Sequence, residues 1–385
     1  MAPSLPMDLV HDILLRLPAS DTCRLRAVCR PWRALLSDPL FAAAHAFRHP
    51  YYPLIAIGYE ASIGNGRVLC DIVDLSGRVV KRVLAAGGSA PAALERVMCA
   101  HHDHICVARG SSMSCHVLNV TTGSIHVLPE GLATEHAKHK QTSAHCWATT
   151  AIGMVPSTGE YKVLRVIHTS CSDDLPTGKL FEAITIDGSS SQAHWRGKGA
   201  PPYPVELGNW HSVVIKHTVY FLLSDYGSFH VGKRGGLVAS FDLESEKWGE
   251  SIPGPLSSFI ARRNLTCFDL KIAALGECLV LGCRKPSVPG VSTSMDLWFL
   301  TDSGKGLWVR QHSVEISELH VPHLAQPLAV LNHGRTAKHY GNWAFMKNFN
   351  PRFQASTDVQ ECCVFVGLYG GNILSLANGS KLASS

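Results

Sequence analysis

Residues 28–41 read VCRPWRALLSDPLF, and this stretch decides how the N-terminal part of the chain folds. Pro31 suits the first turn of a helix that continues through Trp32 and two leucines. Asp38 followed by Pro39 repeats the pairing of a capping residue with a first-turn proline, ahead of the apolar run LFAAAHAF. The stretch therefore predicts one short helix and a start signal for a further one, which with the two upstream helices gives three or four short helices in the unit.

Two more helices are predicted upstream. The segment MDLVHDILLRLP carries apolar residues along one helical face: Leu9, Val10, Ile13, Leu14 and Leu17. We expect Pro18 to end this helix, and a cap signal at Ser20 and Asp21 to open a second helix through Val28. Helices this short, in a unit of about 40 residues, bury too little surface to be stable alone. The unit is therefore expected to be completed by another protein, with Arg24, Arg26, Arg30 and Arg33 facing solvent.

The chain changes character at HPYYP, residues 49–53, which we interpret as a hinge. Short β-type runs with turns follow over residues 54–385, for example VLCDIVDL, YKVLRVIH and DLWFLTDSGKGLWV. A polar turn recurs, in which Asn or Asp stands six positions before a large apolar residue: Asn119 and Ile125, Asp242 and Trp248, Asp302 and Trp308. A strand, an Asx-type turn and a return strand fit this spacing. Tandem units of this kind predict a β-propeller or a related array with an uncounted number of blades.

Composition limits the functional classes. The net charge is +5 over 385 residues, so the dense basic stripe of a nucleic-acid-binding protein is missing. No apolar run approaches the roughly 18 residues of a membrane span, and the N-terminal residues do not resemble a signal peptide. The 13 Cys are irregularly spaced, mostly in apolar runs. We therefore expect reduced thiols and a location in the cytoplasm or the nucleus, or both.

The N-terminal residues closely resemble the F-box. The resemblance rests on Leu5-Pro6, Asp8-Leu9, Ile13-Leu14, Arg16-Leu17-Pro18, Arg24-Leu25-Arg26, Val28-Cys29-Arg30, Trp32-Arg33 and Ser37-Asp38-Pro39 with Phe41. It implies docking on the Skp-type adaptor of a Skp–cullin–F-box ubiquitin ligase. The implied adaptor-binding residues are Leu5, Pro6, Leu9, Ile13, Leu14, Leu17, Pro18, Val28, Cys29 and Trp32. Thr22 and Cys23 depart from the two large aliphatic residues common in the family, which leaves open whether ligase activity is retained.

Several later segments are similar to the F-box-associated domains of plant F-box proteins. They are NVTTGSIHVLP from residue 119, GEYKVLRV at 159–166, LVASFDLESEKWGESIPGP at 237–255 and DLWFLTDSGKGLWVR at 296–310. The resemblance implies a Kelch-like β domain that recruits substrates. We therefore expect an α+β multidomain chain, with an all-α F-box over residues 1–48 and an all-β propeller-like domain over residues 54–385.

The function expected from these resemblances is that of a non-catalytic substrate-recognition subunit, without a cofactor. Its partners would be the adaptor, cullin through that adaptor, and a protein target, with neither nucleic acid nor membrane. Two alternatives stay open. One is an F-box scaffold without ligase activity, and the other is a propeller binding module or enzyme with a vestigial F-box.

Two residue clusters invite other interpretations. CAHHDHIC, Cys99 to Cys106, offers zinc ligands, but no paired Cys or His motif completes a usual zinc finger, and we expect a His-rich turn. A nucleophile elbow, a metalloprotease helix and a phosphate loop are all missing. Five aromatic residues form either a recognition surface or inter-strand packing, and we favour packing: Trp195, Tyr203, Trp210, Tyr226 and Phe229.

Overall fold

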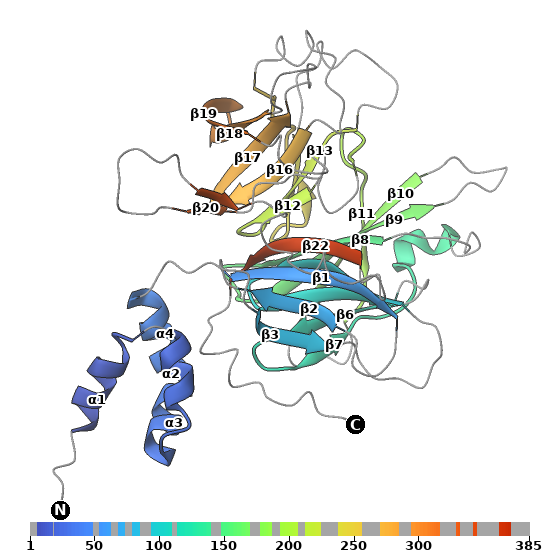
Figure 1. The fold of residues 1–385 in the computed structure, drawn as a ribbon. Helices are drawn as coiled ribbons and strands as arrows, with labels where there is room; N and C mark the ends of the chain where they lie inside the picture. The colour runs from blue at the N-terminus through green and yellow to red at the C-terminus, as the bar shows by residue number, and fades with distance from the viewer. Residues whose placement is uncertain are drawn as a thin grey trace, which may run out of the picture.

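The fold is taken from a computed structural model of the 385-residue chain. The residues it describes are 6–17, 19–48, 54–62, 68–73, 79–84, 94–109, 114–139, 148–169, 178–186, 193–206, 212–224, 238–255, 270–284, 294–315, 329–331, 342–344 and 362–370. Figure 1 shows a small group of helices beside a large β region.

The N-terminal unit contains four short helices, where three or four were expected. They are α1 (Met7–Leu14), α2 (Ala19–Leu25), α3 (Arg30–Leu36) and α4 (Pro39–Arg48). The cap before α4 is confirmed, because the backbone N–H of Leu40 donates to Asp38 Oδ1 at 2.8 Å. α2 differs from the prediction: it begins at Ala19, so Ser20 lies inside its first turn, and it ends before Val28. The helix is thus shorter at its C-terminal end and begins before the predicted cap.

The four helices share one apolar core. Its buried members are Val10, Leu14, Leu15, Leu36, Phe41 and Ala42. The prediction that Arg26 faces solvent is wrong, since only 8% of this residue is exposed. Its Nε and Nη2 donate to the carbonyl oxygen of Leu36 at 3.2 and 2.5 Å, which satisfies a carbonyl at the end of α3. Arg24, Arg30 and Arg33 are exposed as expected.

The β region consists of 22 strands, with one 3₁₀ helix η1 (Thr134–His139) among the described residues. The strands are β1 (Leu54–Ser62), β2 (Val68–Val73), β3 (Val79–Leu84), β4 (Leu94–His101), β5 (His104–Arg109), β6 (Ser114–Asn119), β7 (Ile125–Val127), β8 (Ala148–Met154), β9 (Tyr161–Thr169), β10 (Gly178–Ile186), β11 (Arg196–Lys198), β12 (Ser212–Ile215), β13 (Thr218–Leu222), β14 (Val238–Asp242), β15 (Lys247–Trp248), β16 (Leu270–Leu275), β17 (Cys278–Arg284), β18 (Ser294–Asp302), β19 (Leu307–Glu315), β20 (Ala329–Leu331), β21 (Asn342–Ala344) and β22 (Cys362–Tyr369). Each strand pairs antiparallel with its neighbours.

These strands form the five blades of a propeller. Blades 3, 4 and 5 are the four-stranded sheets β8–β11, β12–β15 and β16–β19. The eight-stranded sheet supplies blade 1, in the order β22-β1-β2-β3, and blade 2, in the order β4-β5-β6-β7. β20 and β21 form a separate two-stranded sheet. The expected small all-α unit followed by a large all-β propeller is thus confirmed.

The ring is closed by strands from opposite ends of the β region. β22 pairs with β1 over seven register positions, from Leu54 opposite Tyr369 to Glu60 opposite Cys362. The Tyr369 hydroxyl also lies 3.2 Å from the Thr121 hydroxyl of blade 2. The inner strands contact one another in the order β22, β4, β8, β12 and β16, and together they surround the propeller axis. None of the helices in the described ranges is long and apolar enough to cross a bilayer.

Candidate functional site

The residues predicted to bind an adaptor fall into three groups. An exposed group contains Pro6, Leu9, Ile13, Val28 and Cys29. A second group faces the core of the helical unit: Leu14 is 1% exposed, while Leu17 and Trp32 are partly buried against the same cluster. Leu5 and Pro18 lie outside the described residues. The predicted set therefore combines residues able to contact a partner with residues that hold the unit together.

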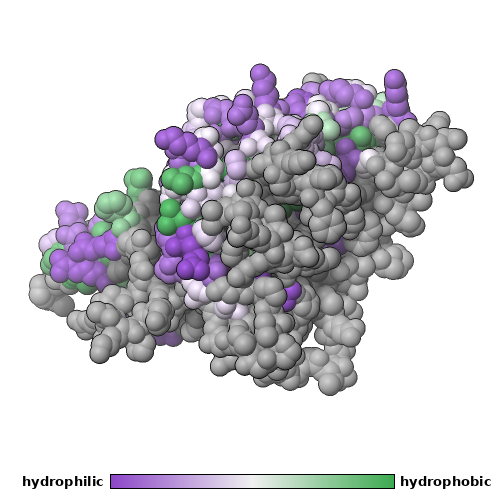
Figure 2. Space-filling view, turned by 90° about the horizontal axis from the view of Figure 1, so that it is seen from above, coloured by the Kyte–Doolittle hydropathy of each residue, from purple (hydrophilic) through white to green (hydrophobic). Residues whose placement is uncertain are grey.

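Exposed apolar side chains are concentrated on the helical unit. Leu9 and Ile13 are 47% and 44% exposed on successive turns of α1, and Val28 is 60% exposed before α3. Met7, Leu40 and Phe47 are also exposed, and the sequence-based list of adaptor-binding residues omitted them. Figure 2 shows hydrophobic surface interleaved with hydrophilic surface on this part of the molecule, at the left. An apolar surface of this kind on so small a unit is typical of a protein-binding face.

Thr22 and Cys23, which depart from the F-box pattern, point inward. Thr22 is completely buried, and Cys23 is partly buried against the apolar core of the helices. Burial is also the first cause of the raised pKa of the Cys23 thiol. A change at these two positions therefore acts first on the packing of the helical unit.

The recurring turn of the β region adopts the predicted Asx form in three blades. Asn119 Oδ1 accepts backbone N–H bonds from Thr121 and Thr122, both at 2.9 Å. Asp242 Oδ1 accepts the N–H of Ser245 at 2.6 Å, and Asp302 Oδ1 accepts that of Lys305 at 3.1 Å. Each turn joins the third and fourth strands of its blade. The repeat seen in the sequence thus marks the same place in each blade.

Three tryptophans connect consecutive blades in the same way. Trp195, just before β11 in blade 3, donates its indole N–H to the carbonyl oxygen of Pro129, just after blade 2, at 2.8 Å. Trp248 of blade 4 donates to Gly199, just after blade 3, at 2.8 Å. Trp308 of blade 5 donates to Pro253, which follows blade 4, at 2.7 Å. Each of blades 3, 4 and 5 is thereby hydrogen-bonded to the end of the preceding blade.

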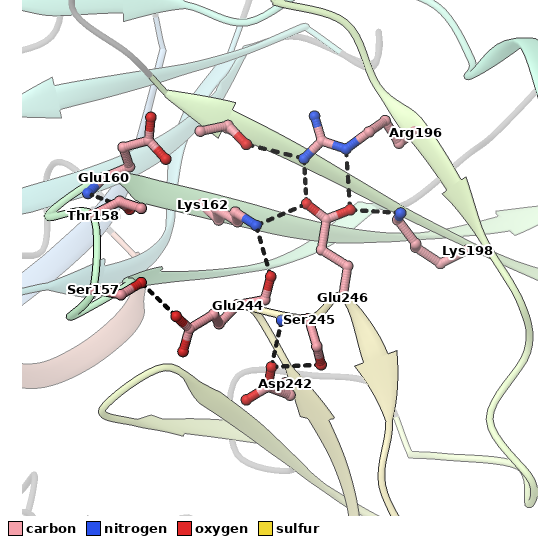
Figure 3. A network of polar contacts seen from close by, with 11 residues as sticks. Ser157, Thr158, Glu160, Lys162, Arg196, Lys198, Asp242, Glu244, Ser245 and Glu246 are labelled. Atoms are coloured by element: carbon pink, nitrogen blue, oxygen red, sulfur yellow. Dashed lines mark hydrogen bonds and ion pairs between the residues drawn. The ribbon is translucent and has the colours of Figure 1, made fainter.

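A polar network centred on Glu246 connects blades 3 and 4 (Figure 3). Lys162 Nζ and Lys198 Nζ lie 3.0 and 2.5 Å from its carboxylate oxygens. Arg196 binds both oxygens, through Nε at 3.0 Å and through Nη2. Burial acts to raise the pKa of Glu246, but the hydrogen bonds from Arg196, Lys198 and Lys162 outweigh burial and lower the pKa from 4.5 to about 2. The carboxylate is therefore charged at neutral pH.

The backbone of Glu246 has a conformation that disfavours any residue with a side chain. Glu246 has φ 54°, a left-handed conformation that costs a residue with a side chain about 1–2 kcal/mol. The same position, four residues after the Asx residue, is Gly123 in blade 2 and Gly306 in blade 5, both with positive φ. A comparison of the three turns in the sequence could have singled out Glu246, because the other two turns have glycine at this position. We infer that its ion pairs offset the cost of the backbone.

The His- and Cys-rich segment forms the β4–β5 hairpin. Cys99 stands opposite Cys106 across the two strands, and His101 stands opposite His104. His104 packs on the ring of Tyr161, with centroids 3.9 Å apart. Among the described residues, no group of three or more His, Cys, Asp or Glu side chains has an arrangement that could hold a metal ion.

The five aromatic residues are only partly described. Trp195 is 4% exposed, carries the Arg165 guanidinium over its ring at 3.8 Å, and shares a core cluster with residues of blades 2 and 3, so it packs between blades. Tyr203 is half-buried. Trp210, Tyr226 and Phe229 lie outside the described residues, so the interpretation of the set as packing is supported only for Trp195.

Comparison with known proteins identifies both parts of the chain. Residues 2–45 match the F-box-like family model, and residues 91–338 match the F-box associated beta propeller domain. F-box protein At3g07870 of Arabidopsis thaliana is 24% identical over 327 residues, which cover 81% of this chain and 72% of that protein. F-box/kelch-repeat protein At3g23880 of Arabidopsis thaliana is 22% identical over 316 residues, with 78% and 77% coverage.

A shorter match is closer. F-box protein At3g22700 of Arabidopsis thaliana is 43% identical over 63 residues, which cover 16% of this chain and 19% of that protein. The similarity to long relatives thus extends through most of the propeller, whereas a higher identity is confined to a short segment. The four-helix unit followed by the five-bladed propeller agrees with both matched models, and the chain belongs to the F-box proteins that carry an F-box associated beta propeller domain.

Proposed function

We propose that this chain is the substrate-recognition subunit of a Skp–cullin–F-box ubiquitin ligase and acts in the cytoplasm or the nucleus, or both. The observation that supports this proposal is the exposed apolar face of α1 formed by Leu9 and Ile13, with Val28 also exposed before α3. Burying this face against an adaptor would favour association through the hydrophobic effect. The propeller would then hold a protein target, which belongs to the proposal as a partner of unspecified identity.

The mechanism we propose is positional. Holding a target near a ubiquitin-charged enzyme raises the effective concentration of the target's lysines. Such a role needs a rigid link between blades more than an acid or a base. The tryptophan bonds between blades and the closure of the ring by β22 and β1 supply rigidity of this kind.

The double variant Leu9→Ala with Ile13→Ala tests the adaptor face. Each side chain is about half exposed. Burial of the exposed half against an adaptor would contribute roughly 1 to 2 kcal/mol to binding at each position. We expect adaptor binding to weaken about five- to thirtyfold per position. Pull-down of purified adaptor measures this effect, and Val127→Ala, a 76% exposed position on β7, is the control. Wild-type adaptor binding by the double variant contradicts the proposed face.

Co-purification from cell extract separates the three functional alternatives. Recovery of both adaptor and cullin supports the ligase subunit. Recovery of the adaptor alone supports a scaffold without ligase activity. Recovery of neither protein supports a propeller module with a vestigial F-box, and overturns the proposal.

A further inference from the structure

A cavity of about 440 Å³ lies on the propeller axis. All five blades contribute to its wall through β22, β4, β8, β12 and β16. Its apolar lining includes Met98, Ala100, Ile152, Val214, Ala274 and Leu368. The volume is within the roughly 300–1,000 Å³ of pockets that bind small molecules.

The polar groups that line the cavity wall are largely uncharged. Burial, followed by the neighbouring His102 and His104, lowers the pKa of His101 from 6.5 to about 3, so its imidazole is neutral. Cys99 and Thr150 satisfy each other, with Sγ and Oγ1 3.4 Å apart. Over the described part of the chain, the side chains of His101 and Ser212 have no hydrogen-bond partner. A neutral imidazole and a hydroxyl are therefore available to a guest molecule.

The mouth of the cavity holds two residues in an unfavourable backbone conformation. The first and second strands of blades 2, 4 and 5 are joined by tight turns that place His102, Lys216 and Gly276 at φ 52°, 57° and 63°. Glycine is the residue that adopts this conformation without cost, yet blades 2 and 4 carry an imidazole and an ammonium there. All three residues line the cavity. Conformations kept against local preference gather at ligand-holding sites.

The charges at the mouth stay near solvent. Lys216 Nζ lies 3.0 Å from Glu277 Oε2, and both side chains are more than half exposed. This ion pair joins the turns of blades 4 and 5 at the rim. Deeper in the cavity, a charged ligand would lose its hydration without gaining a charged partner, which is costly.

We propose that the axial cavity binds a small, uncharged, mostly apolar molecule that hydrogen-bonds to His101 and Ser212. His102 and Lys216 would form the rim over the bound molecule. This site is distinct from the adaptor face, and its occupancy does not depend on the proposed ligase role.

Nile red, an uncharged apolar dye whose emission rises in apolar surroundings, is the probe for this site. We expect the full-length chain to bind one dye molecule saturably. Ala274→Leu fills part of the cavity and should weaken this binding at least tenfold. Ala137→Leu adds the same atoms at an exposed position of η1 and should leave the binding unchanged. His101→Leu keeps the volume and should weaken binding severalfold through the lost hydrogen bond.

The outcomes divide as follows. Saturable binding that Ala274→Leu weakens and Ala137→Leu does not weaken supports the site. No saturable binding by the wild-type chain, or equal binding by Ala274→Leu, overturns it. Thermal melting of each variant checks folding, and Ser212→Leu replaces Ala274→Leu if the latter variant does not fold. Adaptor pull-down with the same samples reports on the proposed function separately, because the helical unit is untouched by these substitutions.

Discussion

Replacing Glu246 by Gln keeps the size of the side chain but removes the charge that three cations share. In the wild-type chain, the lowered pKa means that the folded state stabilises the ionised carboxylate relative to the unfolded state. The difference between 4.5 and about 2 corresponds to about 3 kcal/mol of stability at neutral pH. Only 12% of the Glu246 side chain is exposed, but its lysine and arginine partners are partly exposed, and screening reduces the value to about 2–3 kcal/mol.

The pH dependence has a definite sign. A carboxyl group with a lowered pKa contributes its full stability above its ordinary pKa of 4.5, and loses that stability as pH falls toward the folded-state value of about 2. Wild type and Glu246→Gln should therefore converge in acid, because protonated Glu246 resembles glutamine. About 1 kcal/mol of the gap should disappear by pH 4, and more than half of it by pH 3.

Urea unfolding of the full-length chain measures both effects. We expect the midpoint of Glu246→Gln to fall at pH 7, with an unchanged dependence of free energy on urea concentration. Glu250→Gln is the matched control, because Glu250 is exposed and lies four residues along the same segment. Equal midpoints for Glu246→Gln and Glu250→Gln at pH 7 would refute the reasoning. So would a gap that stays constant between pH 7 and pH 3.

Two further predictions concern the links between blades and between domains. Trp248→Phe keeps a ring in the core but removes the N–H that bonds to Gly199. Urea unfolding should show a free energy of unfolding lower by at least about 1 kcal/mol. A midpoint equal to that of wild type would mean that this bond does not stabilise the contact between blades 3 and 4. Deleting residues 1–48 should leave a soluble chain that melts cooperatively, because the helical core and the propeller cores share no residue. An aggregated product would show instead that the helices cover the β region.

Local signals predicted local structure well. First-turn proline and a preceding Asp located α3 and α4, and Asn or Asp at a fixed distance from a large apolar residue located the Asx turns. These features depend on contacts within a few residues, which the sequence displays directly. The helical period placed Leu9, Val10, Ile13 and Leu14 on one face of α1, but it did not separate the buried Val10 and Leu14 from the exposed Leu9 and Ile13.

Contacts between distant residues were not predictable in this way. Arg26 was expected in solvent because arginine usually is, yet the C-terminal carbonyl of a neighbouring helix draws it inward. The pairing of β1 with β22 joins segments at opposite ends of the β region, and no local pattern encodes that pairing. The blade count remained undetermined for the same reason. The Glu246 network combines residues from two strands of blade 3, β9 and β11, with a turn of blade 4.

The junction between blades 1 and 2 shows how the ring compensates for a missing tryptophan. Blades 3, 4 and 5 each use an indole N–H to bond to the end of the blade before, but the corresponding residue of blade 2 is Ile125, which has no side-chain donor and is 48% exposed. At this junction, and at no other among the described strands, backbone pairing continues from one blade into the next, because β1 pairs with β4 from Glu60 opposite Arg96 to Ser62 opposite Leu94. Main-chain hydrogen bonds do not depend on side-chain identity. Ile125 therefore lies where the sheet is continuous, whereas the separate sheets of blades 3, 4 and 5 are joined by tryptophan N–H bonds, with the Glu246 network added between blades 3 and 4.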